Sequence, residues 1–229
     1  MATMRRHTLA TLMLFAPIAG CRTGETPSGE VPCRELVAAT PAEWPRRWEK
    51  VRTIGSAVTP ALIKALRHNP DGPGAQAAVH LLGTLQDASA RPFLEELLAD
   101  GTSLSTEAAL ALGSLGEPAS VPVLRAVVSG RDKHVTTRAA AAAALVTLGR
   151  ARDVAGFLEA VFLAAGPYGA RSTRAQGLPR KKTRWALERY TLIEALRGRY
   201  EGETFGLDED SSWAALRDGT AKLRAFLNR

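Results

Sequence analysis

The chain of 229 residues is poor in cysteine and in aromatic side chains. Its two cysteines exclude a disulfide framework and a four-cysteine zinc site. Aromatic residues make up only 6% of the chain, whereas 45% of the residues are hydrophobic and 23% are charged. This balance excludes a disordered chain. The length suffices for one ordinary domain with a buried core.

Recognisable catalytic motifs are also lacking. Beyond the N-terminal segment there are three histidines, His68, His80 and His134, with neither HExxH spacing nor a neighbouring cysteine pair. The turn Asp71-Gly72-Pro73-Gly74 is not a phosphate-binding loop, because no Lys-Ser or Lys-Thr follows it. The sequence contains no Gly-x-Ser-x-Gly motif. We therefore expect no metal, no cofactor and no enzymatic activity.

The N-terminal segment has the features of a secretory leader. Arg5 and Arg6 precede an uncharged run from Thr8 to Ala19, which is shorter than the ~20 apolar residues that span a bilayer. Next comes Ile18-Ala19-Gly20-Cys21, which resembles the lipobox of bacterial lipoproteins: an aliphatic residue, two small residues and a cysteine. The resemblance implies that residues 1–20 are a signal peptide and that Cys21 is lipidated and becomes the N-terminus.

The same resemblance implies a location in the cell envelope. Arg22 stands where an aspartate often retains such lipoproteins in the inner membrane, so we expect a lipid anchor at the periplasmic face of the outer membrane. Residues 21–40 are rich in Thr, Gly, Pro, Ser and Glu and show no periodicity, which is typical of a flexible tether. Cys33 would then be the only free thiol, either unpaired, at the surface or partly buried, or paired with another chain in a disulfide.

The middle of the chain repeats itself. A proline recurs at positions 60, 92 and 122, with alanine at 155, at spacings of 32, 30 and 33 residues. Each unit is expected to begin with a helix that carries this proline in its first turn. A second, alanine-rich helix follows and ends at a Leu-Gly or similar pair. These endings are Thr53-Ile54-Gly55, Thr84-Leu85-Gln86, Ser114-Leu115-Gly116 and Thr147-Leu148-Gly149.

These units resemble short bacterial HEAT-like repeats, of the kind also seen in phycobilisome-lyase-type proteins. The resemblance covers residues 52–165 and, less clearly, 182–199, and it is best from Thr137-Arg138 to Leu148-Gly149. It implies an all-α fold: an α-solenoid of about four helical hairpins with a helical cap at each end. Such a fold implies a non-catalytic protein-interaction scaffold. The alternatives are a HEAT-type lyase accessory or enzyme subunit.

Both ends of the folded part, residues 41–229, look like caps. Thr40 and Glu43 have capping-box spacing, and Trp44 and Trp48 lie on one face of the helix that should follow, so we expect these tryptophans in the core. The C-terminal segment carries an apolar stripe from Trp213 to Leu227, with Gly219 as a possible break. Solenoids need such terminal covers.

The positive charge gathers in one segment. Residues 167–199 contain nine basic and two acidic residues, a net charge of +7 that equals the net charge of the whole chain. Leu196 stands in the repeat position of Leu148 but 48 residues later, so about 15 residues are inserted at about 166–181. Insertions in solenoids often mark a binding face. The candidate partner-binding residues are Arg171, Arg174, Arg180, Lys181, Lys182, Arg184, Trp185 and Arg189.

Three interpretations of this basic insert stay open. It is a solvated loop without a partner, or it binds an acidic protein or another anionic envelope component, or it binds nucleic acid. A lipid-anchored protein in the periplasm would meet little nucleic acid. Nucleic acid becomes the favoured partner, in the cytoplasm, if the lipobox reading is wrong. The sequence leaves the oligomeric state open.

Overall fold

The computed structural model describes residues 29–130, 133–163, 186–207 and 213–228. Within these ranges the chain forms eleven α-helices and no strand. The helices are α1 (Glu30–Val37), α2 (Trp44–Arg52), α3 (Thr59–His68), α4 (Ala75–Thr84), α5 (Arg91–Ala99), α6 (Ser105–Leu115), α7 (Val121–Ser129), α8 (Val135–Thr147), α9 (Ala155–Leu163), α11 (Ala186–Arg199) and α12 (Trp213–Leu227).

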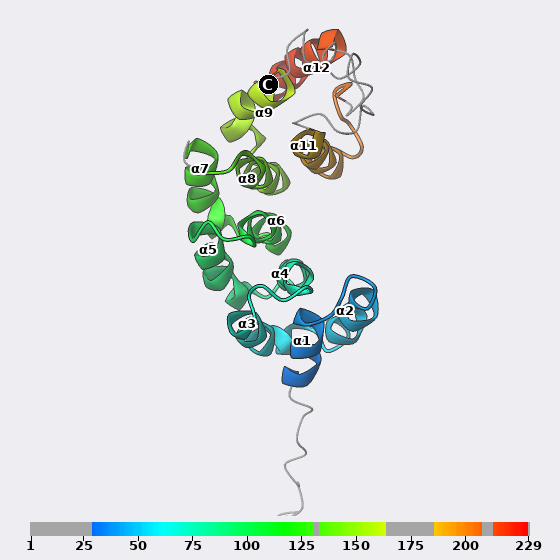
Figure 1. Ribbon diagram of the computed structural model, residues 1–229. Coiled ribbons are helices and arrows are strands. Elements are labelled where there is room, and N and C mark those ends of the chain that lie inside the picture. Colours follow the sequence, from blue (N-terminus) through cyan, green and yellow to red (C-terminus); the bar gives the residue numbers. More distant parts are fainter. Residues whose placement is uncertain (1–28, 131–132, 164–185, 208–212, 229) are drawn as a thin grey trace, which may run out of the picture.

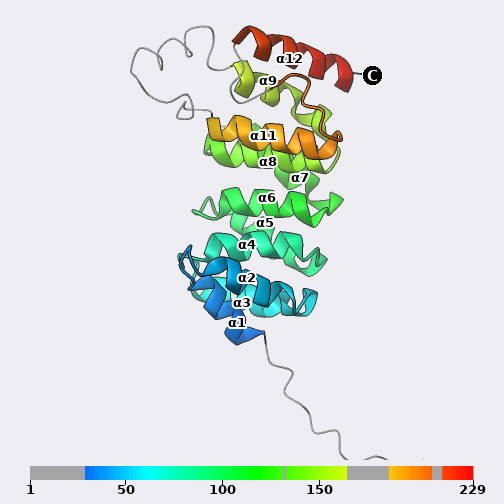
Figure 2. The ribbon, with the colours of Figure 1, turned by 90° about the vertical axis from the view of Figure 1, so that its right-hand side faces the viewer.

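The helices stack in two layers that curve into an arc (Figure 1). Helices α3, α5, α7 and α9 form the outer layer, and α4, α6, α8 and α11 form the inner layer. Seen from its concave side, the inner layer is a ladder with α2 at one end and α11 near the other (Figure 2). The predicted all-α solenoid of helical hairpins is confirmed.

Each repeat starts and ends its helices at residues that favour these positions. Pro60, Pro92 and Pro122 lie in the first turns of α3, α5 and α7, where no backbone N–H is needed. Gly116 ends α6 in the left-handed conformation with φ 80°. Gln86 takes the same role after α4 with φ 53°, so this repeat position tolerates a non-glycine residue. A short 3-10 turn precedes each outer helix, at Ser56–Val58, Ala88–Ala90, Pro118–Ser120 and Ala151–Val154.

Neighbouring inner helices approach one another closely because small residues face each other. A Cβ atom on Gly83 of α4 would lie 2.6 Å from the carbonyl oxygen of Ala111 in α6. A Cβ on Gly113 of α6 would lie 2.8 Å from Cα of Ala144 in α8. Leucines of both layers fill the space between them, and the core runs without a break from Cys33 to Leu227.

The folded part begins earlier than the sequence predicts, so the tether prediction is wrong for its second half. Residues 30–37 form α1, and Cys33, Leu36 and Val37 on its inner face are buried. Helix α1 packs against α2, α3 and α4, and the N–H of Gly74, just before α4, donates to the carbonyl of Val37 at 2.9 Å. A side chain at position 74 would overlap the carbonyl oxygen of Leu36, so the close approach of α1 requires a glycine there. The polar composition of the segment concealed this short apolar face.

The two caps differ from expectation in detail. The carboxylate of Glu43 accepts hydrogen bonds from the Thr40 N–H (3.2 Å) and Oγ1 (2.9 Å), and α2 follows. Trp48 packs partly buried against the core, but Trp44 is 39% exposed, so the expectation of a core residue there is wrong. Gly219 does not break α12; it lets the helix approach Leu207.

No helix within the described ranges is long and apolar enough to cross a membrane.

Candidate interaction surfaces

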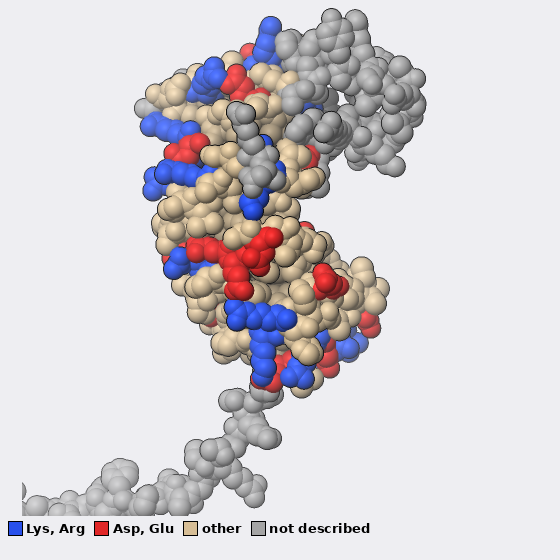
Figure 3. Space-filling view, turned by 60° about the vertical axis from the view of Figure 1, so that its left-hand side comes forward, with Lys and Arg blue, Asp and Glu red and all other residues tan. Residues whose placement is uncertain are grey.

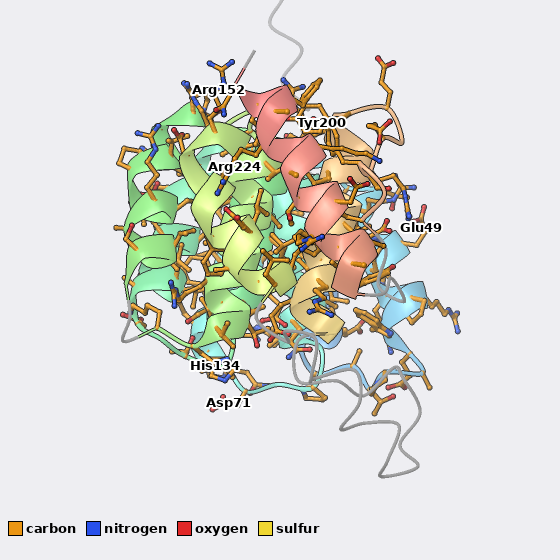
Figure 4. The ribbon with its side chains drawn as sticks, turned by 90° about the horizontal axis from the view of Figure 1, so that it is seen from above. Glu49, Asp71, His134, Arg152, Tyr200 and Arg224 are labelled. Atoms are coloured by element: carbon orange, nitrogen blue, oxygen red, sulfur yellow. The ribbon has the colours of Figure 1, made fainter. Side chains whose placement is uncertain are left out.

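Most of the predicted site residues lie outside the described residues. This applies to the lipobox Ile18, Ala19, Gly20 and Cys21, and to Arg171, Arg174, Arg180, Lys181, Lys182, Arg184 and Trp185 of the basic insert. Their roles stay predictions. The structure does fix where the insert is attached: it joins the end of α9 to the start of α11. That edge also carries the turns at Asp71 and His134, whereas Arg152 and Tyr200 lie at the opposite edge (Figure 4).

Arg189 is not a surface residue, so its place among the partner-binding residues is a wrong prediction. Its side chain is 6% exposed, and burial lowers the pKa of its guanidinium. Nη2 donates to the carbonyl oxygen of Phe162 at 3.0 Å, near the C-terminal end of α9. The buried Nε has no hydrogen-bond partner among the described residues. Arg189 therefore ties α11 to α9 below the insert.

Two other units contain the same kind of contact. Arg138 in the first turn of α8 donates from Nε to the carbonyl of Val128 in α7 at 2.9 Å, and its guanidinium carbon lies 5.0 Å from the ring centroid of Phe157. Ser105 at the start of α6 donates to the carbonyl of Leu97 in α5 at 2.9 Å. A side chain at the start of an inner helix thus satisfies a free carbonyl near the end of the preceding outer helix. In the register that aligns Leu196 with Leu148, Arg189 aligns with Ala141 and not with Arg138, so the repeat pattern does not predict this role.

Side-chain hydrogen bonds join the starts of three inner helices. The hydroxyls of Thr106 in α6 and Thr137 in α8 lie 3.1 Å apart. Thr136 Oγ1 donates to the carboxylate of Glu188 in α11 at 2.9 Å, and Glu188 is itself buried. These contacts fix α11 relative to the repeats, so the insert emerges from a fixed edge of the solenoid.

Lys and Arg side chains lie next to Asp and Glu side chains on the outer side of the solenoid (Figure 3). Many of them form ion pairs between neighbouring units, including Arg67 with Glu96 at 2.8 Å and Arg125 with Asp153 at 3.0 Å. A groove of about 310 Å³ between α9 and α12 is crossed by the ion pair of Arg224 with Glu159. Arg224 lies where α12 passes over α9 (Figure 4).

The histidines and Cys33 take structural positions. The rings of His80 and Trp48 lie 5.5 Å apart, and His134 Nδ1 accepts from the Thr136 N–H at the start of α8. Burial raises the pKa of the Cys33 thiol to about 12. No group of three metal-ligating side chains occurs in the part of the chain that the structure describes.

Comparison with known families agrees with this geometry. The family model of HEAT repeats matches residues 59–145, from the start of α3 to within α8. Residues 59–145 therefore consist of HEAT-like repeats. HEAT repeats are typical of helical protein-interaction scaffolds, and further helices pack on both sides of the matched range. No curated protein and no solved structure matches the chain.

Proposed function

We propose that this HEAT-like protein is a membrane-anchored, non-catalytic interaction scaffold of the bacterial cell envelope, which binds an acidic partner through its basic insert. One observation carries the proposal. Residues 164–185 contain six basic residues and no acidic one, and they connect two helices of an otherwise ion-paired solenoid. A segment that gathers basic residues without any acidic one favours an anionic partner.

The membrane anchor rests on the leader and lipobox of residues 5–21. An acylated Cys21 would hold the scaffold at a membrane, because each buried methylene contributes about 0.8 kcal/mol. A clickable palmitate analogue should label the wild-type protein in growing cells and should not label Cys21→Ala. Recovery of unlabelled wild-type protein in the soluble cytoplasmic fraction would contradict the anchor.

The role of the insert calls for a separate experiment. Envelope proteins are crosslinked in intact cells, and the complexes are captured through wild type or through the triple variant Arg180→Glu, Lys181→Glu, Lys182→Glu. The matched control reverses three exposed arginines elsewhere, Arg46, Arg150 and Arg152. Only the insert variant should lose the acidic partner. Equal capture by all three proteins would refute the insert as the binding site.

The same capture distinguishes the kind of partner. An acidic protein or an anionic envelope component is expected, and its binding should weaken as the salt concentration rises, because salt screens exposed charges. Capture of nucleic acid by a cytoplasmic, unlabelled protein would instead favour a nucleic-acid-binding function.

A further inference from the structure

Helix α1 shortens the stretch of chain between the fold and the predicted anchor. The helix begins at Glu30, so only residues 22–29 lie between it and Cys21. Even when fully extended, this stretch spans at most roughly 30 Å. A lipid on Cys21 would therefore keep α1 within about this distance of the membrane surface.

Helix α1 also lies at the end of the stack that is opposite to α12 (Figure 1). It packs against α2, α3 and α4, and its buried residues Cys33, Leu36 and Val37 face these helices. The opposite side of α1 therefore points away from the stack. That side carries Val31 and Ala38, which are both exposed and lie seven residues apart, on one face of the helix.

Large apolar side chains border this exposed side of α1. Val31 is 59% exposed, Ile54 40% and Trp44 39%, and they are three of the five large hydrophobic residues that are exposed in the described part of the chain. Val31 and Ile54 lie at one edge, because the start of α1 packs beside the turn after α2: a Cβ atom on Gly29 would lie 2.6 Å from Cγ2 of Val58. Trp44 starts α2, after the short turn that follows the other end of α1.

The charges at this end of the solenoid favour an anionic or zwitterionic surface over a basic one. Residues 29–64 contain six basic and four acidic residues. All four carboxylates accept a hydrogen bond from a nearby side chain: Glu30 from Lys64, Glu35 from Lys50, Glu49 from Arg52 and Glu43 from Thr40. The carboxylates are thus occupied within the fold, and the basic residues outnumber them.

We propose that this apolar end, with Val31, Ile54 and Trp44, rests on the phospholipid surface that holds the lipid anchor. The inference rests on the proposed anchor and adds the surface by which the fold meets the membrane. Tryptophan is favoured at the interface between membrane and water. Each basic residue close to an anionic membrane contributes about 1 kcal/mol to binding. The short stretch of chain to Cys21 favours lipid over a protein as the occupant, because it keeps this end next to the membrane.

This contact would orient the whole solenoid. The inner helices α4, α6 and α8 separate α2 from α11 (Figure 2). Since packed helices lie about 8–10 Å apart, α11 would stand roughly 30–40 Å further from the lipid than α2. The basic insert, which is joined to the start of α11, would then face a partner away from the membrane.

Environment-sensitive labels test the contact. The variants Val31→Cys, Ile54→Cys and Tyr190→Cys each add one exposed thiol, whereas Cys33 is fully buried and an acylated Cys21 cannot react. The acylated full-length proteins are labelled with the fluorophore NBD and reconstituted into vesicles of phosphatidylethanolamine and phosphatidylglycerol. Quenching by a doxyl-labelled phospholipid reports how close each label lies to the lipid.

Position 190 is the matched control, because Tyr190 is 50% exposed but lies on α11, far from α1 along the stack. We expect the doxyl lipid to quench the labels at positions 31 and 54 at least threefold more strongly than the label at position 190. Equal quenching at the three positions, or the strongest quenching at position 190, would overturn the proposed contact.

The outcome also separates this contact from the anchor. Palmitate labelling and flotation with the vesicles report the anchor, whereas quenching reports the contact. An acylated, vesicle-bound protein without quenching at positions 31 and 54 would refute the contact alone. A protein that carries no acyl chain and does not float with vesicles would refute both.

A charge on the apolar end gives a second test. In the protein labelled at position 31, Ile54→Glu should lower the quenching at least twofold, because the added carboxylate would lose hydration against lipid. Ala126→Glu, at an exposed position of α7, is the control and should leave the quenching unchanged. Circular dichroism checks that both variants fold. Equal quenching in the two variants would contradict a contact between this end and the membrane.

Discussion

Arg189 carries its positive charge beneath the surface, where it joins the C-terminal end of α9 to α11. Its replacement by alanine removes a charged donor and leaves the Phe162 carbonyl without this partner. We expect Arg189→Ala to lower the free energy of unfolding by about 1–3 kcal/mol, measured by urea denaturation.

Arg197 of the same helix provides the control for this variant. Its side chain is about half-exposed and pairs only with Glu194 among the described residues. Arg197→Ala should change the stability by less than about 0.5 kcal/mol. Equal effects of the two variants would contradict the structural role of Arg189.

Cys33 makes the stability of the protein depend on pH in the alkaline range. The pKa of its thiol is about 12 in the folded state and about 8.5 in an unfolded chain. Above pH 9 the unfolded chain loses this proton while the folded chain keeps it, so the free energy of unfolding falls as the pH rises. The expected fall is about 1 kcal/mol between pH 9 and pH 10.

The variant Cys33→Ala isolates this contribution. Other groups titrate in the same range, so the comparison is between the slopes of urea midpoints against pH for the two proteins. The slope should be shallower in Cys33→Ala. Parallel slopes would show that the thiol ionises as readily in the folded protein as in the unfolded one.

Close helix contact explains why glycine recurs on the inner helices. A Cβ at Gly83 would lie 2.6–2.7 Å from backbone atoms of Ala111, whereas a Cβ at Gly198 of α11 would have no neighbour within 4 Å. Gly83→Ala should therefore destabilise the protein by about 1–3 kcal/mol. The same substitution at Gly198 should stabilise it by up to ~1 kcal/mol, because alanine favours a helix. Thermal unfolding of both variants checks the opposite signs.

The docking of α1 depends on another glycine. Any side chain at Gly74 overlaps the carbonyl oxygen of Leu36, so Gly74→Ala should displace α1 and expose Cys33. We expect Cys33 to react with a thiol reagent in the folded Gly74→Ala protein at least ten times faster than in wild type. Gly156→Ala, where a Cβ would have no neighbour within 4 Å, serves as the control. An unreactive thiol in both variants would show that α1 keeps its place.

The repeated helices were predictable because the signals are local. Pro60, Pro92 and Pro122 mark helix starts, and Gly116 marks a helix end, without reference to distant residues. The sequence did not predict α1 because its buried face is short and the helices that cover it, chiefly α3, lie later in the chain. Arg189 was misassigned because its charge matches the adjacent insert, and only the packing of α9 against α11 shows its acceptor.

At the scale of the whole molecule, the basic insert differs in charge from the repeats. Described residues of neighbouring units pair their charges, as Arg67 does with Glu96, whereas residues 164–185 contain six basic residues and no acidic one. We expect the acidic partner to dissociate as the salt concentration rises from 50 to 500 mM, because salt screens exposed charges. Binding that does not change with salt would contradict an electrostatic contact.

Crosslinked capture from intact cells tests the central claim most directly. Wild type and the variant Arg180→Glu, Lys181→Glu, Lys182→Glu are expressed at equal levels, and their envelope partners are quantified by mass spectrometry. The account predicts that an acidic partner falls at least tenfold in the variant, while palmitate labelling and thermal stability stay unchanged. An identical set of partners in both samples would contradict it.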